Sequence, residues 1–97
     1  MNSDITVKKL KELISTNIQI IDIRSEEDFK HGFIPNALNI SLYQLRLFPE
    51  HYLNKNSVYY LYCNEGDKSD NLCRELTEKG YKVINIIGGY RKWIIDN

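Results

Sequence analysis

A cysteine followed by a short polar run is the feature of this sequence best suited to carry chemistry. Cys63 directly follows the apolar run from Val58 to Tyr62. The thiolate is the nucleophilic form of cysteine, and backbone N–H groups or the positive end of a helix stabilise it. A thiol between a strand and a helix could therefore hold an anion, a persulfide or a substrate oxyanion. The polar residues that would surround it are Asn64, Glu65, Gly66, Asp67, Lys68 and Ser69.

Cys63 also has a second interpretation, as a small apolar residue that ends a buried strand. Free cysteines are often buried, and hydrophobic periodicity does not separate the two interpretations. Gly66 gives the polar run backbone freedom, and Ser69 or Asp70 could cap the helix that follows. The polar run favours a reactive site, while the residues alone leave both interpretations open.

The second cysteine, Cys73, is better explained by core packing. Together with Leu72 and Leu76 it lies on the apolar face of a predicted helix. A resolving thiol that attacks an oxidised or persulfidated Cys63 is the alternative. The two cysteines could form at most one disulfide, and their spacing matches no common zinc pattern. We therefore expect neither a disulfide framework nor a metal site.

Several other polar or aromatic residues are expected to have structural roles. Asp22 and Arg24 end a predicted strand, where an ion pair would hold neighbouring turns; contact with substrate is the alternative. His31 and His51 are expected at the surface, because no nearby group completes a catalytic unit with them. The tyrosines of the run 58–62 are expected to pack, with Tyr60 facing opposite to Tyr59 and Tyr62, and not to form a nucleic-acid stacking platform.

Length, charge and composition exclude several classes of protein. The 97 residues suffice for one compact domain and not for two. Thirteen basic residues balance thirteen acidic ones, so no overall positive field exists to hold nucleic acid or an anionic membrane. The longest apolar run, 18–23, is far shorter than the roughly 20 residues that a membrane helix needs. Residues 1–4 lack the features of a secretory signal, so we expect a cytoplasmic protein.

Short strands alternating with short helices must position Cys63. Strands are predicted over 18–23, 37–40, 58–62 and 83–87. Helices are predicted over 7–14, 25–31, 42–48 and 90–95, with another around 72–76 that Gly80 ends. Thr6 and Ser25 are the expected N-caps, Pro49 is expected to close the third helix, and Gly88 and Gly89 are expected to form a turn.

This alternation predicts a single α/β domain over residues 1–97. The central sheet should be mostly parallel, with about five strands flanked by short helices. In open parallel sheets, sites form beyond the carboxyl ends of the strands, where loops lead into helix N-termini. Cys63 follows such an end.

Four segments carry a resemblance to the rhodanese-like family. Ile21 to Arg24 resembles the strand-ending Asp-x-Arg of that family, and the run from Glu27 to Ile40 is similar to its E-E-F-x-x-G-H-I-P-G-A-x-N-I stretch. Tyr62 to Ser69 is similar to the active-site Y-C-x-x-G-x-R-S, and the run from Gly80 to Trp93 to the closing segment with its paired glycines. The segments appear in order and at suitable spacing over most of Ile21 to Trp93.

The resemblance implies sulfur transfer through a persulfide on Cys63, without a metal or organic cofactor. The donor would be a small sulfur compound such as thiosulfate, or a persulfidated protein, and the acceptor a thiol or cyanide. The six-member loop from Cys63 to Lys68 has the length that the family's sulfurtransferases use to cradle the persulfide. Related phosphatases use Cys-x5-Arg, and Ser69 stands where that arginine would be. Phosphatase or arsenate reductase chemistry is therefore disfavoured.

Three departures from the family pattern affect these expectations. Lys68 replaces an arginine and loses its planar pair of donors. Phe33 and Asn36 replace His and Gly, which should alter packing more than chemistry. Glu65 and Asp67 add two carboxylates that would repel thiosulfate, so a protein-bound or small persulfide is the better donor. The alternative function is a binding or redox-sensing module that docks a protein partner through the cysteine loop.

Overall fold

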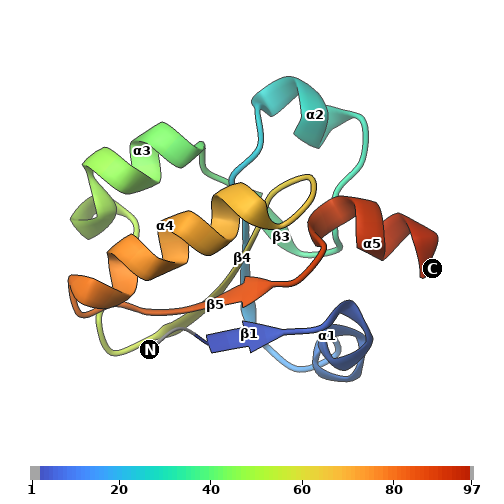
Figure 1. Cartoon of the computed structure of the whole chain (residues 1–97), viewed down its shortest axis with the longest axis horizontal. Helices are drawn as coiled ribbons and strands as arrows, with labels where there is room; N and C mark the ends of the chain where they lie inside the picture. Colours follow the sequence, from blue (N-terminus) through green and yellow to red (C-terminus); the bar gives the residue numbers. More distant parts are fainter. Residues whose placement is uncertain (1–2, 97) are drawn as a thin grey trace.

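Five parallel strands form one sheet in the computed structural model, which describes residues 3–96 (Figure 1). Met1, Asn2 and Asn97 lie outside the described residues. The prediction that residues 1–4 lack the features of a secretory signal therefore falls partly outside the structure described. The strand order is β1-β5-β4-β2-β3. The strands are β1 (Ser3–Ile5), β2 (Gln19–Asp22), β3 (Ala37–Asn39), β4 (Val58–Tyr62) and β5 (Lys82–Ile86).

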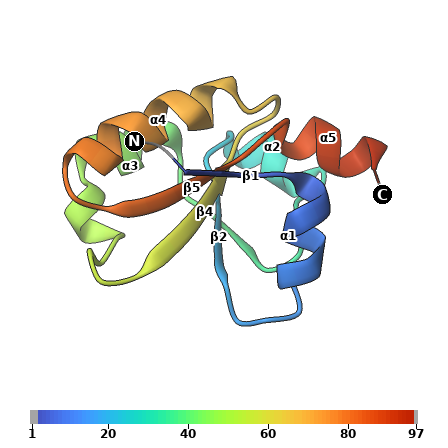
Figure 2. The ribbon, with the colours of Figure 1, turned by 60° about the horizontal axis from the view of Figure 1, so that its bottom comes forward.

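Helices cover both faces of the sheet, as the connections of a parallel sheet require (Figure 2). One face carries α3 and α4, whose buried Leu45 and Leu72 share a core cluster with Leu61 of β4. The other carries α1 and α5, whose Leu10 and Trp93 pack in a second cluster. The helices are α1 (Val7–Leu13), α2 (Glu26–Lys30), α3 (Leu42–Leu47), the 3₁₀ turn η1 (Pro49–His51), α4 (Asp67–Glu78) and α5 (Gly89–Ile95).

The predicted α/β class, the parallel sheet and most of the elements are confirmed. Thr6 and Ser25 are N-caps, each accepting a hydrogen bond from the backbone three residues ahead. Two bounds differ slightly: Pro49 opens the turn η1 after α3 has ended, and Gly89 is already the first residue of α5. Strand β1 was missed because it has three residues, of which Ile5 alone is buried.

Two local predictions were wrong. Neither Ser69 nor Asp70 caps α4, since Gly66 is the N-cap and the helix begins at Asp67. The last three residues of the expected polar loop therefore form the first turn of this helix. The face of Tyr62 was also predicted wrongly. Tyr59 and Tyr60 lie on opposite faces, as predicted, but Tyr62 packs with Tyr60 against the α1 cluster and not with Tyr59 in the α4 cluster.

Candidate functional site

The sulfur of Cys63 lies at the carboxyl end of β4, enclosed by the turn that leads into α4. The residue is only 4% exposed. The backbone N–H of Gly66 lies 3.1 Å from Sγ and that of Ser69 lies 3.4 Å from it, so both amides donate to the sulfur. The Ser69 amide belongs to the first turn of α4, where N–H groups have no partner within the helix. The fold thus directs two amides at the Cys63 sulfur, an arrangement that suits a negatively charged group there.

Helix α5 supports this turn from behind. The N–H of Tyr90 donates to the Cys63 carbonyl at 2.9 Å, and that of Arg91 donates to the Asn64 carbonyl at 2.9 Å. A Cβ on Gly89 would come within 2.3 Å of the Cys63 carbonyl oxygen, so only glycine permits this approach. With these two carbonyls held by α5, the chain is fixed where it turns around the sulfur.

A buried ion pair anchors the neighbouring strand end. Arg24 donates to Asp22 from Nη2 at 2.7 Å, and the Asp22 side chain is fully buried. Burial disfavours the charged guanidinium, but hydrogen bonds from Arg24 to Asp22 and the charge of that carboxylate outweigh burial and raise the pKa of Arg24. The predicted ion pair between these two residues is confirmed.

Tyr62 joins this buried cluster from β4. Its hydroxyl donates to Asp22 Oδ2 at 2.6 Å and accepts from the Ile34 N–H at 3.1 Å. Burial, together with the hydrogen bond to Asp22, raises the pKa of Tyr62 well above its ordinary value, so the phenol stays neutral. The guanidinium of Arg24 lies 5.6 Å from the Tyr62 ring and 4.3 Å from the Tyr90 ring. These contacts tie the ends of β2 and β4 together beside Cys63.

The ion pair also reaches the first residue of the cysteine turn. Arg24 Nη1 donates to Asn64 Oδ1 at 3.3 Å, and Asn64 Nδ2 donates to Asp28 Oδ2 at 3.2 Å. Asn64 is thereby held between the β2–α2 segment and α2. The predicted site residue Asn64 is a wall of the site, and its side-chain amide is occupied by Arg24 and Asp28.

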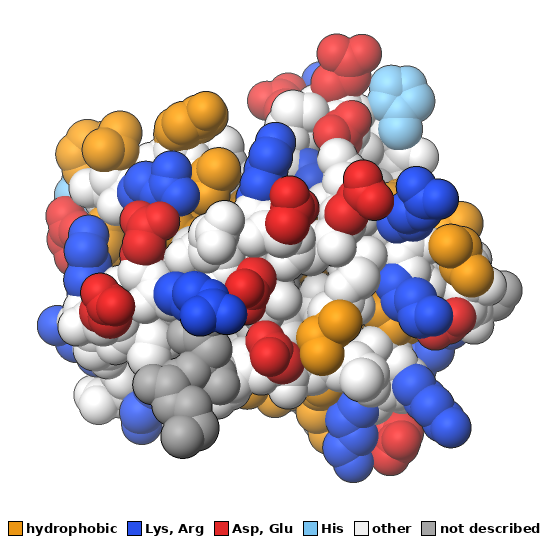
Figure 3. Space-filling view, in the orientation of Figure 1, with side chains coloured by type: hydrophobic (Ala, Val, Ile, Leu, Met, Phe, Trp, Pro, Cys, Tyr) orange, Lys and Arg blue, Asp and Glu red, His pale blue; other side chains and the backbone are white. Residues whose placement is uncertain are grey.

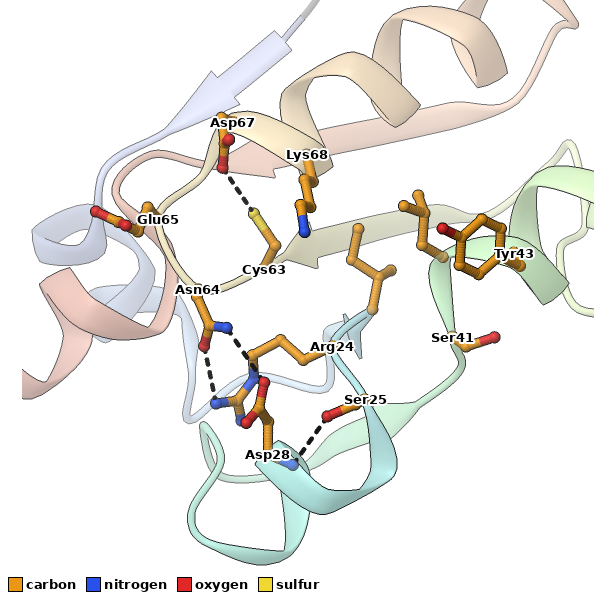
Figure 4. A pocket seen from close by; sticks show the side chains of 12 residues that line it. Arg24, Ser25, Asp28, Ser41, Tyr43, Cys63, Asn64, Glu65, Asp67 and Lys68 are labelled. Atoms are coloured by element: carbon orange, nitrogen blue, oxygen red, sulfur yellow. Dashed lines mark hydrogen bonds between the residues drawn. The ribbon is translucent and has the colours of Figure 1, made fainter.

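A pocket of about 530 Å³ opens in front of Cys63 (Figure 4). Asp67 points toward the sulfur, with its Oδ1 3.8 Å from Sγ, and Lys68 extends into the pocket. Glu65 extends away from the sulfur, and its carboxylate lies 3.8 Å from Arg91. The pocket is lined by Ile23, Arg24, Ser25, Asp28, Ser41, Leu42, Tyr43, Cys63, Asn64, Glu65, Asp67 and Lys68.

The charge in this pocket is more negative than positive. Three carboxylates line it, those of Asp28, Glu65 and Asp67. Of the two cations, Arg24 is neutralised by Asp22, which leaves Lys68. Around the pocket the surface carries acidic and basic side chains side by side, with no broad patch of one sign on the face drawn (Figure 3). A small dianion therefore enters against a local negative potential.

The structure brings five of the predicted site residues to the pocket and places two elsewhere. Asn64, Glu65, Asp67 and Lys68 line it beside Cys63. Gly66 and Ser69 are buried behind the sulfur, to which both donate their amides.

The opposite wall of the pocket was missed from the sequence. Asp28 and Tyr43 belong to the helices that follow β2 and β3, and Tyr43 is 69% exposed at the mouth. The signal was available, because parallel strands end at one edge of the sheet and the residues that follow them meet there. Asn85, which the next strand places behind Ser69, had no signal beyond being polar in an apolar strand.

The remaining candidates lie outside the pocket. Cys73 is fully buried in the α4 cluster, where burial first and then the charge of Asp70 raise the pKa of its thiol to about 12. His31 and His51 are exposed, as predicted. Within residues 3–96, no three His, Cys, Asp or Glu side chains are arranged so that they could hold a metal ion, and no helix has the length and apolar character needed to cross a membrane.

Comparison with known proteins gives a consistent result. The model of the rhodanese-like domain family matches residues 6–96. "Putative sulfurtransferase YtwF" of Bacillus subtilis is 34% identical over 94 residues, which cover 93% of this chain and 88% of that protein. "Thiosulfate sulfurtransferase GlpE" of Coxiella burnetii is 32% identical over 78 residues, 79% of this chain and 72% of that one.

Solved structures share the fold over nearly the whole chain. SSP1007 from Staphylococcus saprophyticus superposes with a TM-score of 0.84 at 32% identity, covering 96% of this chain and 93% of that one. A rhodanese-like domain protein from Staphylococcus aureus gives a TM-score of 0.82 at 32% identity, covering 96% and 91%.

Proposed function

The chain belongs to the rhodanese-like domain family, and from that premise we propose that it is a sulfurtransferase that carries a sulfane sulfur on Cys63. The observation that carries the proposal is the convergence of the Gly66 and Ser69 amides on Sγ inside an open pocket. Relatives named as sulfurtransferases support the same reaction class.

The reaction has two displacement steps without net oxidation. The Cys63 thiolate attacks the sulfane sulfur of a donor, forming the Sγ–S bond while the bond between donor and sulfane sulfur breaks. The donor leaves with that electron pair, as a thiolate from a persulfide or as sulfite from thiosulfate. An acceptor thiolate or cyanide then attacks the outer sulfur, and the Sγ–S electron pair returns to Cys63 as thiolate.

The residues of the turn supply electrostatic stabilisation. The Gly66 and Ser69 amides donate to the sulfur when it carries charge, and the fixed turn loses no energy in rearranging. The remaining turn amides are the groups that we propose receive the outer sulfur; they belong to Asn64, Glu65, Asp67 and Lys68. Lys68 adds a positive charge to the pocket, and among residues 3–96 it forms no ion pair. Metal or organic cofactors have no part in these steps.

The charge of the pocket favours a persulfide as donor over thiosulfate. Thiosulfate brings two negative charges toward Asp67, whose carboxylate lies 3.8 Å from Sγ, and toward Asp28. A small or protein-bound persulfide brings at most one at the reacting sulfur. We therefore propose that persulfides load Cys63 faster than thiosulfate does.

Intact mass measured without reductant tests the function. Reduced wild type, Cys63→Ser and Cys73→Ser are each exposed to thiosulfate or to a small-molecule persulfide, and measured before and after cyanide. Wild type and Cys73→Ser should gain one sulfur that cyanide removes, and Cys63→Ser should gain none. If neither donor loads wild type, sulfur transfer from these donors is excluded, and a partner-binding module becomes the function to pursue.

Asp67→Asn tests the choice of donor, with Glu65→Gln as its matched control. Both remove one negative charge, but Glu65 extends away from the sulfur and pairs with Arg91. Asp67→Asn should increase the rate at which thiosulfate loads Cys63 about tenfold, because removing a nearby charge changes the interaction by roughly 1.4 kcal/mol. Glu65→Gln should increase this rate much less. Equal gains in both variants would contradict a role for the position of Asp67.

A further inference from the structure

A buried hydroxyl lies between the sulfur of Cys63 and a strand residue. Ser69 Oγ is 3.4 Å from Cys63 Sγ and 2.6 Å from Asn85 Oδ1. Ser69 is fully buried and Asn85 is 4% exposed, so neither side chain exchanges its partners freely with water. These contacts link β5 to the reactive sulfur through one serine.

The orientation of the Asn85 amide decides where the serine proton lies. Asn85 Nδ2 is 3.4 Å from the Gly66 carbonyl, to which it donates, so Oδ1 faces Ser69. An amide oxygen only accepts hydrogen bonds, and a serine hydroxyl has one proton to give. Ser69 Oγ has a second possible acceptor, the Gly66 carbonyl oxygen at 3.3 Å, but Asn85 Oδ1 at 2.6 Å is much closer. The proton therefore lies toward Asn85, and Ser69 Oγ presents a lone pair to the sulfur.

A lone pair beside Sγ has opposite effects on two forms of Cys63. A neutral Sγ tolerates it, because a thiol can donate its S–H to Ser69 and a persulfide carries its charge on the outer sulfur. The lone pair does not stabilise a thiolate on Sγ. The thiolate would gain the Ser69 hydroxyl as a third donor, beside the Gly66 and Ser69 amides, only if that hydroxyl turned away from Asn85. That turn leaves the Asn85 oxygen buried without a donor, which is costly.

We propose that Asn85 is a positioning residue, which holds the Ser69 proton away from Cys63 and so favours the loaded persulfide over the free thiolate. The inference rests on the proposed sulfur transfer. When an acceptor takes the outer sulfur, the Sγ–S bond breaks and its electron pair stays on Sγ. Asn85 makes this leaving thiolate less stable, so the carried sulfur is retained until a strong nucleophile arrives.

Other charged or titratable groups lie on the elements packed around Cys63 and remain unchanged when Asn85 is replaced. From the turn and α4 these are Asp67, whose carboxylate is nearest, together with Glu65, Lys68, Asp70 and Cys73. From the β2–α2 segment, α3 and α5 they are Arg24 with Asp22, Asp28, Tyr43, Tyr90 and Arg91. A shift in the pH midpoint of thiolate formation on Cys63 after substituting Asn85 is therefore measured with all these other charges unchanged.

Asn85→Leu tests the inference, because it removes the acceptor with little change in volume. The pH midpoint of thiolate formation on Cys63 is followed by absorbance at 240 nm and by the rate of iodoacetamide alkylation. Freed from Asn85, Ser69 should donate to the charged thiolate in preference to the neutral Gly66 carbonyl at 3.3 Å. The midpoint should then fall by about one pH unit. Had Asn85 only held the turn through the Gly66 carbonyl, its loss would loosen the amides and raise the midpoint. An unchanged or raised midpoint overturns the inference.

Ser69→Ala supplies a second, independent test that does not depend on the folding of Asn85→Leu. Because the Ser69 proton is held by Asn85, removing the hydroxyl should move the midpoint by less than about 0.3 pH unit. A rise of about one unit would show that Ser69 already donates to the thiolate, and would overturn the inference. In the double variant with Asn85→Leu, the lowering seen in Asn85→Leu alone should disappear.

Persulfide lifetime links the inference to function. Loaded Asn85→Leu should pass its sulfur to excess thiol several-fold faster than loaded wild type, and an equal or slower rate contradicts retention by Asn85. The pH midpoint is measured on protein that carries no persulfide, so its result does not depend on sulfur transfer. Failure of wild type to load removes the proposed function and with it the retention of sulfur, but leaves the position of the Ser69 proton to the midpoint test. A wrong midpoint shift removes the role of Asn85 and leaves the proposed function standing.

Discussion

The two cysteines are both nearly removed from solvent, yet their surroundings differ in kind. Cys63 is 4% exposed and Cys73 is fully buried. Two backbone amides and a serine hydroxyl surround the Cys63 sulfur at the edge of the sheet. Cys73 lies on the inner face of α4 among aliphatic side chains, and within residues 3–96 no hydrogen bond to its sulfur is found.

The comparison shows that two cysteines of similar burial can have very different polar surroundings. At Cys73, burial without donors penalises the thiolate and raises the pKa of the thiol to about 12. At Cys63, the helix start and the turn supply donors where the chain leaves the sheet, and a pocket leads to the sulfur. Position at a strand end, and not exposed area, separates the cysteine with amide donors and a pocket from the cysteine in the core.

Native-state alkylation should show the largest difference between the two residues. With iodoacetamide at pH 7.5, Cys63 should react at least about 10³-fold faster than Cys73, because burial withholds both the thiolate and access at Cys73. Trypsin cleaves at Lys68, between the two cysteines, so peptide mass spectrometry reports each rate separately.

Denaturant provides the control for this experiment. In 6 M guanidinium chloride the two cysteines should react at similar rates, since the unfolded chain protects neither. Rates within tenfold of each other in the native protein would show that Cys73 is as available as Cys63, and the comparison would fail.

Replacement by serine should separate the two residues by stability. Cys73→Ser puts a hydroxyl among aliphatic side chains and should lower the free energy of unfolding by about 2 kcal/mol. In Cys63→Ser the hydroxyl oxygen still accepts from the Gly66 and Ser69 amides. This substitution should therefore lower the free energy of unfolding by less than about 1 kcal/mol. Urea unfolding followed by circular dichroism measures both. An equal loss in both variants would mean that packing dominates at the two positions alike.

The same difference explains which parts of the structure the sequence predicts. The amphipathic face of α4 and the position of Cys63 after β4 follow from local patterns, and both predictions were confirmed. The buried cluster of Asp22, Arg24 and Tyr62 was predicted in part, because Asp22 and Arg24 are neighbours in sequence. The contact of Tyr62 depends on the pairing of β2 with β4, which no local pattern contains.

The start of α4 was misplaced for a related reason. A serine or aspartate is the usual N-cap, and Ser69 and Asp70 fitted that rule. In the structure Gly66 takes the N-cap position with a φ of +94°. The Cys63 sulfur accepts the Ser69 amide that a capping side chain would otherwise have taken. Tertiary position thus overrides the capping preference at the site itself, and it also brings Asn85 to Ser69 from a different strand.

Alkaline pH should reveal the smallest difference, through the raised pKa of Cys73. The folded protein holds this proton more tightly than the unfolded chain, whose cysteine titrates near its ordinary pKa of about 8.5. The stabilisation is therefore complete below that value and is lost progressively as the pH rises from there toward the folded-state pKa of about 12. The test compares the single variant Cys63→Ser with the double variant that also carries Cys73→Ala. Between pH 8 and 9.5, the free energy of unfolding of the single variant should fall by about 1 kcal/mol more than that of the double variant.

The choice of pH window isolates Cys73 from the other buried acid. The pKa of Tyr62 is also raised, but an unfolded tyrosine titrates near 10, so Tyr62 destabilises the fold only above this range. Both proteins carry Cys63→Ser, which removes the titration of the reactive thiol from the comparison. Urea unfolding at each pH gives the two slopes. Parallel slopes would show that Cys73 ionises as easily in the folded protein as in the unfolded chain, and that the core does not hold it as a thiol.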